Sequence, residues 1–278
     1  VNSTGGIAVP KLLKALGVER VTEYYTEPDG QFPHNPEPVP ENLTVICSEI
    51  KKGQFDLGLV VDPDVDRLAI IAEDGTPFGE EYTLVAVSDY VLNHTPGNTV
   101  SNLSSSKALK DVTYKHGCSY YPSAVGEVNV VDVMKENDAV IGGEGNGGVI
   151  FPELHYGRDA LVGIALFLSY LAKFNKSASF LRSTYPNYFA SKNKVELTDD
   201  MDVDLILEKI SSKYNSHPIN RIDGIRIEFD DEWVHLRKSN TEPIIRIIAE
   251  SDSESKSELL AQKLISDIKE IISYKEIE

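Results

Sequence analysis

Apolar and polar positions in the first third of the chain follow the two periods that distinguish helices from strands. Apolar residues at helical spacing predict three helices, at 9–16, 42–52 and 82–92. Short apolar runs predict three strands, at 21–25, 57–61 and 68–72. Helices that alternate with short strands predict an α/β domain, which we place at 1–95.

The same kind of pattern starts again after Pro96 and Gly97. It predicts a strand, two helices, a strand–turn–strand unit and a long apolar helix, at 99–103, 104–116, 128–136, 139–151 and 159–174. Asp62 and Gly143 hold the same place in the two series, a loop between two apolar strands, which suggests an internal structural repeat. We therefore expect a second α/β domain at 96–190.

The pattern changes after Pro186. Two helices and four strands are predicted there, the helices at 203–214 and 255–274 and the strands at 194–197, 224–229, 233–236 and 244–249. Helices at both ends of a strand meander indicate an α+β domain, at 191–278. The predicted fold class is α/β, with two related α/β domains followed by a C-terminal α+β domain.

Composition narrows the function classes. The 278 residues include 44 acidic and 27 basic side chains, and the resulting formal charge of −17 argues against nucleic acid as a partner. No apolar run is long enough to span a membrane, which argues against a membrane partner. Cys47 and Cys118 do not form a disulfide framework, which favours the reducing cytoplasm. We expect a cytoplasmic enzyme and make no prediction of its oligomeric state.

An acidic loop at 62–67 carries the strongest chemical signal. The carboxylates of Asp62, Asp64 and Asp66 can converge on one hard cation, for which Mg²⁺ is the natural choice. A calcium EF-hand is rejected, because Arg67 stands where that loop needs glycine. Arg67 also suits a site that receives an anion. A solvated acidic turn remains the alternative.

A glycine-rich loop at 142–148 surrounds Glu144 and Asn146 with five glycines. Glycine lets the backbone approach a ligand closely, and carboxylate and amide side chains suit the vicinal hydroxyls of a sugar. The alternative is a flexible tight turn with two incidental polar residues.

A basic loop at 237–243, with the sequence RKSNTEP, has the composition of a phosphate site. The alternative is a polar hairpin loop. In a chain of charge −17, however, an anionic ligand needs local positive potential. Outside this loop, the arginines that can supply it are Arg67, Arg158 and Arg246.

Three further residues are weaker candidates. Arg158 precedes a long helix and could face the site, while Asp159 is expected to cap that helix. His34 and His155 could carry protons, although solvated loop histidines are more common.

The three loops, in this order, resemble those of the α-D-phosphohexomutase superfamily, and the likeness covers the whole chain. The metal loop of that family reads D-G-D-G-D-R, and Pro63 and Val65 replace its glycines here. Its sugar loop reads G-E-x-S-G, and Asn146 stands in the serine position. Its phosphate loop reads R-x-S-G-T-E-P, and Asn240 stands in the glycine position.

The resemblance implies a role for each loop. Asp62, Asp64 and Asp66 would hold Mg²⁺, with Arg67 beside the transferring phosphoryl group. The implied substrate ligands are Glu144 and Asn146 for the sugar hydroxyls, and Arg237, Ser239, Asn240 and Thr241 for the non-reacting phosphate.

Members of this family are isomerases of carbohydrate metabolism that interconvert hexose 1-phosphates and 6-phosphates. An active-site phosphoserine donates the phosphoryl group, and a hexose 1,6-bisphosphate is the intermediate. The family fold has four domains, and this chain resembles the second, third and fourth. The nucleophile motif Ser-His-Asn-Pro does not occur here, since Pro33 precedes His34. We expect a fragment that is inactive alone and binds Mg²⁺ weakly.

The sequence leaves the substrate and the function class open. Phosphomannomutase or phosphoglucomutase activity is the first expectation, and phosphoglucosamine mutase activity is the second. A sugar-phosphate binding module without a nucleophile is the non-catalytic alternative. A metal-dependent phosphatase would leave the glycine-rich and basic loops unexplained.

Overall fold

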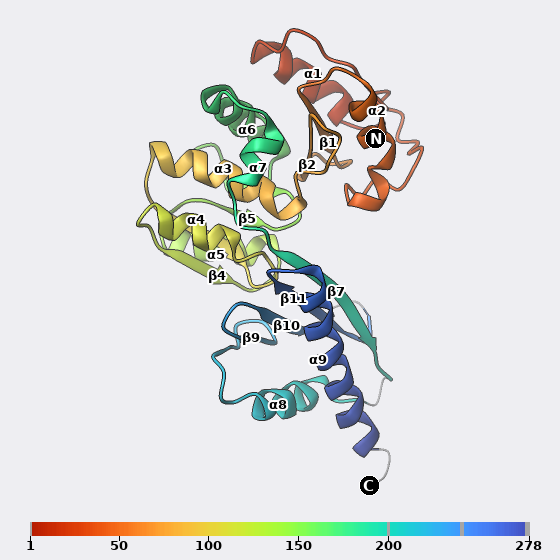
Figure 1. Cartoon of the computed structure of the whole chain (residues 1–278), viewed down its shortest axis with the longest axis vertical. Helices are drawn as coiled ribbons and strands as arrows, with labels where there is room; N and C mark the ends of the chain where they lie inside the picture. Colours follow the sequence, from red (N-terminus) through yellow and green to blue (C-terminus); the bar gives the residue numbers. More distant parts are fainter. Residues whose placement is uncertain (1, 199–200, 240–241, 276–278) are drawn as a thin grey trace. The chain divides into compact units, whose positions relative to one another are not determined.

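The computed structural model describes residues 2–198, 201–239 and 242–275, and the chain forms two compact units (Figure 1). Unit 1 comprises Val1–Pro122 and Gly126–Pro186, and unit 2 comprises Ser123–Val125 and Asn187–Glu278. Within the described residues, no helix combines the length and the apolar character needed to cross a membrane.

The first part of unit 1 contains two helices, a short 3-10 helix and a two-stranded sheet. Their bounds are α1 (Gly5–Ala15), η1 (Pro40–Asn42), α2 (Thr44–Lys52), β1 (Leu57–Val61) and β2 (Leu68–Ala72). The antiparallel register pairs Leu57 with Ala72 and Val61 with Leu68. Every residue of β2 is buried, whereas β1 is mostly half-buried. Both strands have the bounds predicted from their apolar runs.

The strand predicted at 21–25 is wrong, because this segment is irregular. Val21, Tyr24 and Tyr25 are all about 40% exposed, and Tyr25 has a left-handed φ of 54°. A β-rich composition favours a strand only where a partner strand supplies hydrogen bonds and packing. Among the described residues, no strand pairs with this segment.

The second part of unit 1 is a four-stranded sheet with helices packed on it. Its elements are α3 (Glu80–His94), β3 (Asn98–Asn102), α4 (Ala108–Lys115), β4 (Tyr120–Ser123), α5 (Glu127–Glu136), β5 (Ala139–Glu144), β6 (Gly148–Ile150), α6 (Ala160–Phe174) and α7 (Ala178–Ser183). The strand order is β4-β3-β5-β6, with β3 parallel to β5 and β5 antiparallel to β6. Helix α5 packs on β3 and β5 through Val130 and Met134, both fully buried. The carboxyl ends of β3 and β5 therefore lie at the same edge of the sheet.

Unit 2 is an antiparallel sheet covered by two helices. Its elements are β7 (Phe189–Glu196), α8 (Val203–Lys213), β8 (Ile219–Asn220), β9 (Ile225–Glu228), β10 (Trp233–Lys238), β11 (Ile244–Ser251) and α9 (Glu254–Lys275). The strand order is β7-β11-β10-β9-β8. Side chains of α8 and α9 share one apolar core with the sheet, which includes Ile210, Ile227 and Leu264. This arrangement is the predicted α+β domain.

Candidate functional site

The acidic loop connects β1 with β2 and is organised by Asp62, which is 1% exposed. One carboxylate oxygen of Asp62 accepts the backbone N–H groups of Asp66 and Arg67, both at 3.0 Å. The other oxygen accepts Nε of Arg67 at 2.7 Å. A carboxylate that bonds the backbone of its own loop closes the turn locally. The position of Arg67 thus follows from residues only a few positions away.

Three carboxylates of the acidic loop converge as predicted from their alternation. One oxygen each from Asp62, Asp64 and Asp66 lies within 4.8 Å of the others. Asp64 is exposed, whereas the side chain of Asp66 is 17% exposed. Oxygen ligands that converge from several carboxylates suit a hard divalent cation such as Mg²⁺. The residues present therefore fit this ion.

The surroundings of Asp62 and Asp66 shift the pKa values of the two carboxyl groups in opposite directions. Burial, a hydrogen bond with Asp62 and the nearby charges of Asp62 and Asp64 raise the pKa of Asp66, although Arg158 opposes the rise. Burial also opposes ionisation of Asp62, but hydrogen bonds from Asp66 and Arg67 outweigh it and lower the pKa of Asp62. Between these two carboxyl groups, the surroundings of Asp66 are thus the ones that favour the protonated form.

The glycine-rich loop joins β5 to β6 and presents Glu144, which is 5% exposed. Its Oε1 accepts Nδ2 of Asn102 at 2.7 Å and the backbone N–H of Gly126 at 3.2 Å. Its Oε2 accepts Nη1 of Arg158 at 2.7 Å. A carboxylate oxygen can accept two hydrogen bonds, so Oε2 keeps one place for a further donor such as a sugar hydroxyl.

Asn102 is a site residue that the sequence analysis missed. It ends β3, and the parallel register that pairs Ser101 with Gly143 brings it beside Glu144. The sequence offered one signal for Asn102, which is its position at the end of a predicted strand and just before a serine-rich turn. Only the parallel alignment of β3 with β5 identifies its partner.

The glycine-rich loop is joined by backbone contacts to the end of the acidic loop. The N–H of Leu68 donates to the carbonyl of Gly147 at 3.1 Å. Gly147 has a φ of +88°, and a Cβ there would lie 2.4 Å from the carbonyl oxygen of Leu68. Only glycine permits this approach. The neighbouring Asn146 turns its side-chain oxygen to the N–H of Gly148 at 3.1 Å.

Arg158 lies with both loops. Its guanidinium pairs with Asp66 and Glu144, and also with Glu127 of α5, a residue that the sequence analysis did not select. Asp159 caps α6 as predicted, because its Oδ1 accepts the N–H groups of Leu161 and Val162 at 2.7 and 3.2 Å.

The two candidate histidines lie at different places. His155 is 48% exposed and bonds to Asp159 at 3.0 Å, so the helix cap holds its ring. His34 bonds to the carbonyl of Asn35 at 2.7 Å and its ring packs edge-on against Tyr25. The proline-rich loop that carries His34 reaches the acidic loop through Glu37, whose carboxylate lies 3.2 Å from Nη1 of Arg67.

The basic loop belongs to unit 2 and follows β10. Arg237 is half-buried and Ser239 is 4% exposed, while Asn240 and Thr241 lie outside the described residues. The antiparallel register places Arg237 directly opposite Arg246 of β11. Like charges at such a pair are destabilising, and an anion bound between them would relieve the repulsion.

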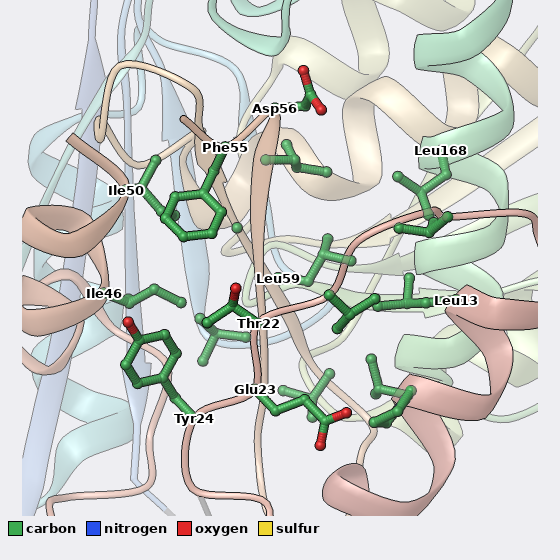
Figure 2. Close-up of a pocket in the computed structure, with 18 of the residues that line it drawn as sticks. Leu13, Thr22, Glu23, Tyr24, Ile46, Ile50, Phe55, Asp56, Leu59 and Leu168 are labelled. Carbon is green, nitrogen blue, oxygen red and sulfur yellow. The ribbon is translucent and has the colours of Figure 1, made fainter. Parts of the chain in front are cut away.

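A cavity of about 1040 Å³ in unit 1 lies apart from Asp64 and Asp66. It opens between α1, the irregular segment 18–26, α2 and β1, and Figure 2 shows its mainly apolar lining. The labelled apolar side chains include Leu13, Ile46, Ile50, Leu59 and Leu168. Asp62 and His34 also reach its wall.

Models of one protein family match most of the chain. They are described as the phosphoglucomutase/phosphomannomutase alpha/beta/alpha domain II, alpha/beta/alpha domain III and C-terminal domain. The matched residues are 1–75, 79–188 and 193–266.

Individual relatives agree with these matches. A phosphoglucomutase/phosphomannomutase of Thermococcus kodakarensis is 36% identical over 92% of this chain and 56% of its own length. A probable phosphoglucosamine mutase of Methanopyrus kandleri is 31% identical over 98% of this chain and 60% of its own. A Burkholderia thailandensis phosphoglucomutase/phosphomannomutase family structure superposes with a TM-score of 0.85 at 27% identity, over 96% of this chain and 58% of that one. The chain thus spans less than two thirds of these relatives.

Proposed function

Since the chain belongs to the phosphoglucomutase/phosphomannomutase family, we propose that it is the metal-binding and substrate-binding part of a phosphohexomutase. The proposed reaction moves a phosphoryl group between the 1- and 6-positions of a hexose phosphate. The observation that supports it most is the junction of the acidic and glycine-rich loops, where carboxylates for a cation adjoin a carboxylate for a sugar.

In this proposal the acidic loop holds Mg²⁺ through Asp62, Asp64 and Asp66. When bound, the ion would stabilise negative charge on the transferring phosphoryl group. Arg67 lies beside the triad, with its Nε on Asp62 and one terminal nitrogen on Glu37. Its guanidinium adds positive charge that an otherwise acidic loop needs to receive a phosphate.

Each of the other two loops has its own proposed role toward the substrate. Glu144 would accept a sugar hydroxyl at the remaining place on Oε2, and Asn146 would contribute its amide. Arg237, Ser239, Asn240 and Thr241 would bind the non-reacting phosphate, with Arg246 opposite Arg237 adding positive charge. The names of the relatives place glucose, mannose and glucosamine phosphates among the substrates to test.

The phosphoryl donor in this proposal is a phosphoserine outside these 278 residues, and hexose 1,6-bisphosphate is the intermediate. The chain alone is therefore expected to bind hexose phosphates without turning them over.

Calorimetry with glucose, mannose and glucosamine 1-phosphates, each with and without Mg²⁺, tests the proposal. We expect at least one sugar phosphate to bind more tightly with Mg²⁺, because a divalent cation offsets the charge of the acidic loop. Asp66→Asn should reduce this Mg²⁺ dependence, whereas Asp56→Asn, outside the loop, should preserve it. The proposal fails if no hexose phosphate binds in any condition. Turnover of a hexose phosphate by this chain, seen by ³¹P NMR, would contradict only one part of the proposal, the phosphoserine donor outside these 278 residues.

A further inference from the structure

The guanidinium of Arg158 connects the acidic loop to the glycine-rich loop. Nη2 forms an ion pair with Asp66, while Nη1 lies 2.7 Å from Oε2 of Glu144. Nε lies 3.4 Å from Oε2 of Glu127, and the side chain is 21% exposed. The planar fork of an arginine can hold two carboxylates at a fixed angle, which the ammonium of a lysine cannot do.

The backbone near Arg158 is attached to the same surroundings. Its N–H donates to Oε1 of Glu127 at 2.9 Å. Two residues later, the N–H of Ala160 donates to the carbonyl of Val65 in the acidic loop at 3.0 Å. A Cβ on Gly148 would lie 2.5 Å from Cδ of Arg158, so the aliphatic part of the arginine side chain packs on β6 at a position where only glycine leaves room for it. Both ends of the side chain are therefore fixed.

Negatively charged side chains outnumber positively charged ones around Arg158. Two arginines, Arg67 and Arg158, share ion pairs with five carboxylates, those of Glu37, Asp62, Asp66, Glu127 and Glu144. Arg158 is shared between a candidate cation ligand, Asp66, and a candidate sugar ligand, Glu144. A ligand that fixes either carboxylate thus also fixes the arginine that orients the other.

We propose that Arg158 is a positioning residue that couples cation binding at the acidic loop to sugar binding at the glycine-rich loop. This inference rests on the proposed function. Such coupling is reciprocal, so the cation and the hexose phosphate must tighten each other's binding by the same factor.

Paired titrations measure this factor. Mn²⁺, detected by electron paramagnetic resonance, is titrated with and without glucose 1-phosphate, and glucose 1-phosphate is titrated calorimetrically with and without Mn²⁺. For the unmodified chain we expect mutual tightening of about fivefold or more. Arg158→Lys retains the charge but cannot bridge both carboxylates, so the factor should fall below about twofold. Arg20→Lys, at an exposed arginine outside the loops, should leave the factor unchanged.

The results separate this inference from the proposed function. If the unmodified chain binds both ligands and Arg158→Lys shows the full coupling factor, the role of Arg158 is overturned while the proposed function stands. If the unmodified chain binds no hexose phosphate tested, both are overturned.

A folding control keeps the test decisive. Melting curves show whether Arg158→Lys is folded. If it is not, Glu127→Gln replaces it, because this change removes the charge that pairs with Nε of Arg158 and keeps the arginine itself. A reduced coupling factor in Glu127→Gln supports the role of Arg158, and an unchanged factor overturns it.

Discussion

At the scale of single residues, Val65 shows what the acidic loop requires of its backbone. Its φ of 63° lies in the left-handed region, which a β-branched residue rarely adopts. The family loop has glycine at this position, where the same conformation costs little. Val65 is nevertheless only 8% exposed. Packing of its side chain therefore opposes the strain of its backbone.

Val65→Gly is accordingly expected to change the free energy of unfolding by less than about 1 kcal/mol. Relief of about 1–2 kcal/mol of backbone strain offsets a similar loss of apolar burial. The matched variant Val100→Gly, in the buried strand β3, relieves no such strain and should cost about 3 kcal/mol. Urea denaturation measures both. A cost near 3 kcal/mol for Val65→Gly would show that its conformation is unstrained.

At the scale of elements, one carboxylate determines where α6 begins and hence where Arg158 leaves the preceding loop. Asp159 accepts two N–H groups of the first helical turn through Oδ1 and holds His155 through Oδ2. The backbone N–H of Asp159 in turn donates to the carbonyl of Val149 in β6 at 2.9 Å. The helix start is thus tied to the strand that follows the glycine-rich loop.

Asp159→Ala should destabilise unit 1 by about 1 kcal/mol, the usual cost of losing an N-cap. Asp159→Asn keeps a capping oxygen and should remain within a few tenths of a kcal/mol of the unmodified chain. Asp202→Ala removes the corresponding cap of α8, where Asp202 accepts the N–H of Leu205 at 3.1 Å, and serves as the control in unit 2. Thermal denaturation followed by circular dichroism compares all three. Equal stability of Asp159→Ala and Asp159→Asn would contradict the capping role.

The elements also show how far the sequence could be interpreted alone. Periodicity was sufficient where apolar residues face one core, as in β1, β2 and α8. It missed β4, because Pro122 interrupts a short edge strand, and α7, which is only 6 residues long. The loops were recognisable because their residues are consecutive. Asn102 and Glu127 were not, because only the folded sheet brings them to Glu144 and Arg158.

At the scale of the whole molecule, the fluorescence of the single tryptophan reports on unit 2, because Trp233 lies in that unit. Trp233 is 1% exposed in unit 2, where its Nε1 donates to Glu250 at 2.7 Å. His235 of the same strand is also 1% exposed, and in its neutral form its Nε2–H donates to the carbonyl of Asp223 at 2.7 Å. Burial lowers the pKa of His235 to about 4, with Arg226 and Arg237 adding to the effect and Asp223 opposing it.

Acid should therefore destabilise unit 2 through His235. The unfolded histidine takes up a proton near its ordinary pKa of about 6.5, whereas the folded one resists protonation until about pH 4. The free energy of unfolding is therefore greatest above about pH 6.5 and falls as the pH decreases from there to about 4. The loss approaches about 3 kcal/mol. Urea denaturation followed by Trp233 fluorescence measures it, and His235→Gln should flatten the dependence between these pH values. An equally steep dependence in His235→Gln would assign it to other groups.

The cavity beside β1 also affects how molecules of this chain behave toward one another. Among the described strands, only β2 pairs with β1, so the edge of β1 beside the cavity has no partner strand. Such an edge is a template for intermolecular strand pairing. Self-association that grows with protein concentration is the expected consequence, and sedimentation velocity measures it. A charge placed on the edge by Leu59→Lys should suppress this association, just as natural proteins protect their open sheet edges.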